Sequence, residues 1–267
     1  MTNITRRAAL GAGLALGARA GAQSRAAGAP LRYGLSVWPP NLQPWPSTGA
    51  AAGMVKMLIH RRLTSFDERG ELRGELAREF GRDPDGAWVF RLRPEAVFGN
   101  GERVTAEDVR FTIEQVAGER STAYYRTQMQ EIERIETPDP HTVRLVMKEP
   151  IATVPLWFAN ANMPIVWRRS RDLNNPVGCG PYRITGQERG SWIELGAVPN
   201  YWVPGLPRTR TIRMTVYADE NLRQAALLSG DVDMIEFVPW TGMAAVESDP
   251  RFRLESTVGP FMDILFN

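Results

Sequence analysis

The chain contains a single cysteine, Cys179, and only two histidines, His60 and His141, among 267 residues. One thiol cannot form an internal disulfide, so packing of the core must stabilise the fold unaided. The three residues lie far apart in the sequence and do not show the ligand spacing of a zinc site. No apolar run reaches the roughly 20 residues that a membrane-spanning helix needs. These absences exclude a disulfide scaffold and give no support for a metal centre or a membrane span.

Signatures of catalysis are equally scarce. Cys179 lies between two glycines, and pairing it with a histidine would make a cysteine hydrolase, but no third, orienting group is indicated. Asp231, Asp233 and Glu236 do not follow the calcium-loop pattern, and a helix end followed by a strand explains them. The segment GCGPY is not followed by a glycine-bearing helix start, so no phosphate loop is expected. We expect no enzyme activity, no cofactor and no metal.

Residues 1–22 have the layout of a cleavable export signal. Arg6 and Arg7 begin it, a short apolar run follows, and the small residues Ala20-Gly21-Ala22 end it at the expected cleavage point. The arginine pair resembles a twin-arginine signal, and a general secretory signal that carries two arginines is the alternative. We therefore expect a periplasmic protein that is soluble after cleavage.

The formal charge of +2 comes from this signal. Three of the 32 basic residues and none of the 30 acidic ones lie in residues 1–22, which leaves 29 basic against 30 acidic side chains, a net charge of −1. Nucleic acid is therefore not an expected partner.

Periodicity after residue 30 predicts a mixture of strands and helices. The predicted strands are 31–37, 88–92, 132–136, 142–147, 211–217, 232–238, 252–256 and 261–267, with strand–turn–strand units over 64–72 and 178–198. The predicted helices are 50–63, with Met54, Met57 and Leu58 on its apolar face, 106–118 and 220–229, and LAREF (76–80) is a short helix or turn. The strand–helix–strand order over 211–238 implies a parallel pair with a right-handed crossover.

Several short signals fix the ends of these elements. Asn100-Gly101 predicts a tight turn, and Thr105 with Asp108 a variant capping box. Asp219 is a good N-cap, and Gly230 a helix stop.

The order of several blocks resembles the family 5 extracellular solute-binding proteins, which are the peptide-, nickel- and glutathione-type receptors of bacterial ABC importers. The blocks are NLQPWP, LTSFDERGELRGELAREF, DGAWVFRLRPEAVFGNGERVTAEDV, GCGPY, NYWVPGLPRTRTIRM and ALLSGDVDMI. Two residues depart from the family pattern: Asn100 after Gly99, where a His-Asp or Ser-Asp pair is usual, and Cys179, where threonine is usual.

The resemblance implies an α/β fold of the class II periplasmic binding protein type, with two lobes around a cleft. Residues 31–50 and 178–267 would form the first lobe, and 51–177 a subdomain inserted in it. Family members are usually much longer, and the chain ends inside a strand-like run, so we expect the second lobe to be missing.

The resemblance also implies capture of a peptide or similar small solute in the cleft by a monomer, and its delivery to the membrane permease of an ABC importer. From their placement we expect the solute to contact Trp38, Asn41, Trp45, Tyr124, Cys179 and Trp240, and the alternative for each loop aromatic is that it packs its loop onto the core. Three other functions remain open: a metal-chelate or haem carrier of the same family, an exported cysteine hydrolase that uses Cys179, and a truncated product without a binding function.

Overall fold

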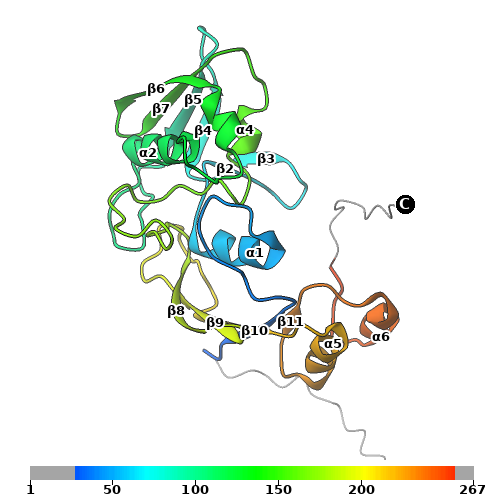
Figure 1. The fold of residues 1–267 in the computed structure, drawn as a ribbon. Coiled ribbons are helices and arrows are strands. Elements are labelled where there is room, and N and C mark those ends of the chain that lie inside the picture. Colours follow the sequence, from blue (N-terminus) through cyan, green and yellow to red (C-terminus); the bar gives the residue numbers. More distant parts are fainter. Residues whose placement is uncertain (1–27, 256–267) are drawn as a thin grey trace, which may run out of the picture.

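A computed structural model of the chain describes residues 28–255 (Figure 1). The predicted signal over 1–22 and the predicted strand over 261–267 lie outside the described residues. Within them, one five-stranded sheet and one four-stranded sheet each carry a separate hydrophobic core. The helices α5 and α6 lie beside the five-stranded sheet (Figure 1).

The five-stranded sheet joins segments that are far apart in the sequence. Its order is β11-β1-β10-β9-β8, with β1 Leu31–Leu35, β8 Tyr182–Glu188, β9 Trp192–Ala197, β10 Thr211–Val216 and β11 Met234–Ile235. Strand β1 pairs in parallel with both β10 and β11, whereas β9 and β8 continue the sheet as antiparallel strands. The predicted strands over 31–37, 178–198 and 211–217 are confirmed.

The predicted parallel pair needs a correction, because β10 and β11 are not neighbours. Tyr33 of β1 lies opposite Met214 on one side and Met234 on the other, so β1 occupies the position between them. The ion pair of Arg32 with Asp233, at 2.8 Å, reinforces the β1–β11 side. The order of strands depends on a segment almost 200 residues away, which local periodicity cannot reveal.

Helix α1 (Gly49–Ile59) packs on this sheet with a face that matches the predicted one only in part, since Leu58 packs against the core of the sheet but Met57 does not. Ala51, Val55 and Ile59 join the core of the five-stranded sheet, while Met57 is exposed. Small residues allow the helix to approach the sheet closely, and the bulkier methionine faces outward. The helix also ends earlier than predicted, because Arg61 forms a bridge with Ile165.

The segment that follows builds the four-stranded sheet, in the order β4-β5-β7-β6. Its strands are β4 Ala77–Arg82, β5 Trp88–Leu92, β6 Ile132–Asp139 and β7 Thr142–Met147, and its helices are α2 Ala106–Ala117, α3 Arg126–Gln130 and α4 Val154–Trp157. A hairpin of β2 (Thr64–Phe66) and β3 (Leu72–Gly74) precedes it. The prediction of a helix or turn over LAREF is wrong, since β4 pairs there with β5 despite its helix-favouring residues.

Local signals around this sheet are confirmed. Gly101 has the positive φ of 86° that the predicted turn needs. The carboxylate of Asp108 accepts hydrogen bonds from the backbone N–H of Thr105 at 3.0 Å and from its hydroxyl at 2.7 Å. Asp108 is fully buried and also pairs with Arg168, so this carboxylate fixes the start of α2 rather than performing chemistry.

The C-terminal part of the described chain is helical. Helix α5 (Glu220–Ser229) begins at Asp219, whose carboxylate accepts two backbone N–H bonds, and ends at Gly230 with φ 82°, as predicted. The short helices η1 (Trp240–Gly242) and α6 (Met243–Ser248) were not predicted. Residues 252–255 form no strand, so the prediction of a strand there is wrong for the described residues.

Candidate ligand-binding site

The C-terminal edge of the three parallel strands gathers loops from distant parts of the chain. The backbone N–H of Tyr217, after β10, donates to Leu35, and that of Glu236, after β11, donates to Gly34. The turn between β8 and β9 lies at the same edge, because Val216 donates to Ser191. Ligands of open α/β sheets bind outside the carboxyl ends of the strands. This edge is therefore where we place the candidate site.

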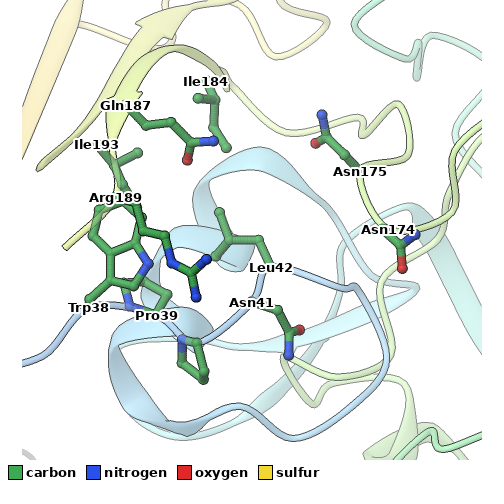
Figure 2. Close-up of a pocket in the computed structure, with 11 residues that line it drawn as sticks. Trp38, Pro39, Asn41, Leu42, Asn174, Asn175, Ile184, Gln187, Arg189 and Ile193 are labelled. Carbon is green, nitrogen blue, oxygen red and sulfur yellow. The ribbon is translucent and has the colours of Figure 1, made fainter.

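A hollow of ≈ 610 Å³ opens beside this edge (Figure 2). Trp38, Gln187 and Arg189 lie on one side of it, and Asn174 and Asn175 on the other. The remaining lining residues are Pro39, Pro40, Asn41, Leu42, Ile184 and Ile193. This volume is within the range of small-molecule sites, and the mixture of an indole ring, aliphatic side chains and polar groups is typical of them.

The polar groups of the hollow are largely available to a ligand. No described carboxylate forms an ion pair with Arg189, and its guanidinium points into the hollow (Figure 2). The Asn41 side-chain oxygen accepts from the backbone of Gln43, and that of Asn174 accepts from the Gln43 side chain at 2.5 Å, so within residues 28–255 neither amide NH₂ group has an acceptor. The hollow thus offers donors and one positive charge.

Two buried side chains hold the end of β11 in place. Glu236 accepts hydrogen bonds from the backbone N–H and the hydroxyl of Ser36, at 2.5 and 2.6 Å. The guanidinium of Arg223 donates to the carbonyls of Tyr217, Glu236 and Phe237 at 2.8–3.0 Å. Phe237 has a φ of +53°, a strained conformation that these bonds maintain. Together they tie β1, β10 and β11 to one another at the edge.

Of the predicted contact residues, Trp38 and Asn41 come together in the hollow. Trp240 lies at the same sheet edge, after β11, with 80% of its surface exposed. Tyr124 is exposed but stacks edge-on against Tyr125 and is tied through its backbone to Trp45. Their contact with a solute stays a prediction.

Trp45 and Cys179 occupy the core instead. The Trp45 indole N–H donates to the Pro164 carbonyl at 3.2 Å, and Cys179 has no exposed surface. Burial raises the pKa of the Cys179 thiol to about 12, so the thiolate that a cysteine hydrolase needs is strongly disfavoured. For Trp45, the alternative that a loop aromatic packs its loop onto the core describes this position.

Arg189, Gln187 and Glu236 were not predicted as site residues. Arg189 lies in the turn of the predicted strand–turn–strand unit as an ordinary turn residue, and only the strand order brings it to Trp38. The one signal that could have found Glu236 is its place directly after a strand of a parallel pair.

The family of this chain is identified by its similarity to known proteins. A family model described as "Bacterial extracellular solute-binding proteins, family 5 Middle" matches residues 71–266. The chain belongs to this family. Its members bind solutes and are not enzymes, and the mixed α/β fold matches about half of class II periplasmic binding protein chains. None of the helices in residues 28–255 has the length and apolar character to cross a bilayer.

Individual members of family 5 are similar at different levels. The glutathione-binding protein GsiB of Escherichia coli O1:K1 is 22% identical over 80% of this chain and 43% of its own length. The binding protein AgaA of A. tumefaciens R10, solved with agropinic acid, is 33% identical with a TM-score of 0.78, over 83% of this chain and 46% of that one. OppA of Burkholderia pseudomallei is 18% identical with a TM-score of 0.73, over 81% and 47%. The chain therefore spans about half the length of these family 5 relatives.

Proposed function

We propose that this chain is part of a periplasmic receptor that captures a peptide or a similar small solute and delivers it to the permease of an ABC importer. The observation that carries the proposal is the hollow beside the C-terminal edge of the parallel sheet, in a chain that belongs to family 5. The relatives named above bind glutathione and agropinic acid, and both are small solutes with carboxylates. A free guanidinium and amide donors suit such groups.

The lobe assignment of the sequence stays part of this proposal. The five-stranded sheet, formed by residues from 31–35 and 182–235, would belong to the first lobe, and the four-stranded sheet to the inserted subdomain. The sequence assignment put most of helix α1 in the inserted subdomain; because α1 packs on the five-stranded sheet, we propose to move this boundary to the end of α1. Capture would be non-covalent, with Trp38 packing on the solute and Arg189 binding a carboxylate.

Thermal unfolding with a panel of peptides, glutathione, opines and metal chelates tests the proposal. A solute at 100 times its Kd should stabilise the fold by about 2.7 kcal/mol. Titration calorimetry should then show a loss of roughly tenfold or more in affinity for Arg189→Ala, because a hydrogen bond to a charged group contributes about 1.5–3 kcal/mol. Arg208→Ala, which removes an exposed arginine outside the hollow, is the matched control. Failure of every solute to raise the melting temperature contradicts the proposal.

A further inference from the structure

Glu236 has one carboxylate oxygen that the described chain does not use. Its side chain is buried, with 6% of the residue exposed, and Ser36 donates both of its hydrogen bonds to Oε1. The other oxygen, Oε2, is buried and receives no hydrogen bond from any residue in 28–255. Leaving a buried acceptor without a donor is unfavourable, and the free-energy cost is larger for a carboxylate than for a neutral group. Such an exception in a native structure therefore needs an explanation.

Arg223, which donates to the backbone of Glu236, does not supply that donor. Arg223 is itself buried, and its Nε, Nη1 and Nη2 atoms donate to the backbone carbonyls of Glu236, Tyr217 and Phe237. The hydrogen bonds that this guanidinium donates within residues 28–255 all end on main-chain oxygens, so Oε2 has no donor there.

The surroundings of Glu236 favour a cation as that donor. The next residue, Phe237, keeps its strained positive φ and leaves 64% of its surface exposed, and Trp240 is exposed on the turn of η1. Strained residues gather at binding sites, and the faces of phenyl and indole rings attract cations. All three residues follow β11 at the C-terminal edge of the parallel strands, and the hollow opens along the same edge on the side of β8 and β9.

We propose that Oε2 of Glu236 accepts a hydrogen bond from a cationic nitrogen of the solute, an ammonium or guanidinium group, and that Phe237 and Trp240 cover it. This inference rests on the proposed receptor function. It adds a second point of recognition to Arg189: the edge would bind a solute that carries both a positive nitrogen and a carboxylate. Both Arg189 and Glu236 lie outside the part of the chain that forms the four-stranded sheet.

Paired probes test the proposal directly. Di- and tripeptides with a free amino terminus and the same peptides with an acetylated terminus differ by one cationic nitrogen, and calorimetry or tryptophan fluorescence gives their affinities for the whole chain. The variant Glu236→Gln keeps an acceptor for Ser36 and turns an NH₂ group toward the solute in place of Oε2. Glu247→Gln, an equal change of charge at an exposed position of α6, is the matched control.

We expect the natural chain to prefer the free-amino peptides by roughly 10- to 100-fold, the range of a charged hydrogen bond. Glu236→Gln should abolish that preference, so that this variant binds the free-amino and the acetylated peptides with affinities within about twofold of each other. Glu247→Gln should bind as the natural chain does. Equal binding of both peptide forms by the natural chain, or a preference that survives in Glu236→Gln, overturns the proposal and means that Oε2 holds only water.

The receptor function has a separate outcome in the same experiment. If neither peptide form binds but another amine-bearing solute of the panel does, such as glutathione against its N-acetylated form, that pair replaces the peptides and the same comparison decides. If no solute of the panel binds the natural chain, the receptor function fails and this inference fails with it. Binding without any amine preference contradicts the inference on Glu236 alone.

Discussion

His60 is a buried histidine whose two ring nitrogens have no hydrogen-bond partner among residues 28–255. It lies directly after α1, against Gly178. Burial lowers its pKa from 6.5 to about 3, and the positive charge of the nearby Lys56 acts in the same direction. The folded protein therefore holds the neutral ring at any pH above about 3, whereas the unfolded chain takes up a proton below about 6.5.

This difference predicts a loss of stability in mild acid. The group has a depressed pKa in the folded state, so the stability that it contributes is present above pH 6.5 and lost as the pH falls toward 3. Between pH 7.5 and 5, above the range in which carboxylates titrate, we expect the free energy of unfolding to fall by about 2 kcal/mol. Urea unfolding at a series of pH values measures it.

The variant His60→Leu should remove most of this slope, because leucine does not titrate and no hydrogen bond of the ring is lost. Met57→Leu, on the exposed side of the same helix, is the control and should keep the slope of the natural chain. If His60→Leu keeps the full slope, the acid sensitivity has another origin.

At the scale of single residues, the sequence signals that gave correct predictions of helix ends act over three or four residues. Thr105 with Asp108, Asp219 and Gly230 form their bonds within one helical turn, so their neighbours in sequence are their partners in space. The site residues differ, because Ser36 and Glu236 bond across 200 positions. No local pattern contains that contact.

Among the elements, the end of α1 and the glycine-rich strip before β8 are in very close contact. The N–H of Gly180 donates to the Ile59 carbonyl at 3.1 Å, and the carbonyl of Gly178 accepts from Gly99. A β-carbon on Gly178 would lie 2.0 Å from the Ile59 oxygen, and one on Gly180 2.4 Å from that of Leu58. These glycines are needed for close approach of two backbones and not for a special φ.

Gly178→Ala should therefore be destabilising. The added methyl meets backbone atoms, which cannot move away as a flexible side chain can, and we expect a loss of roughly 1–3 kcal/mol in the free energy of unfolding. Gly53→Ala provides the matched control, because nothing lies within 4 Å of its added carbon in α1, and alanine should stabilise the helix by about 0.4–1 kcal/mol. Chemical denaturation measures both variants, and equal effects would contradict the close-approach argument.

The elements also show why types of structure were easier to predict than faces and neighbours. Alternation in β5 and β7 and capping of α2 and α5 identified them, since each depends on a short segment. The residues LAREF failed because β5 offers them a partner strand, and tertiary pairing overrides a weak helical preference. The buried face of α1 was predicted only in part, because Leu58 packs against the sheet as expected whereas Ala51 and Val55 are buried in place of Met57.

For the whole molecule, the candidate site exists only through the order of the five-stranded sheet. That order places the loop after β1, the β8–β9 turn and the segment after β11 along one edge, although the chain that folds into the other sheet separates the first of these segments from the other two. The resemblance to family 5 predicted the class of fold, and composition excluded a disulfide scaffold. The positions of Arg189 and Glu236 required the topology.

This arrangement predicts where a bound solute will slow backbone hydrogen exchange. With the proposed function, a solute that stabilises the fold should protect residues 36–42, 187–192 and 236–240 together, because all three segments border the same edge. Strands β5 and β7 pair with each other in the centre of the four-stranded sheet and take no part in that edge, so their exchange should stay within error of the empty protein. Exchange followed by mass spectrometry, with and without the solute at 100 times its Kd, measures both regions in one sample. Arg189→Ala, tested at the same solute concentration, should show weaker protection in all three segments at once, because reduced occupancy affects the edge as a unit. Protection confined to β4–β7, or to only one of the three segments, would place the solute elsewhere on the molecule.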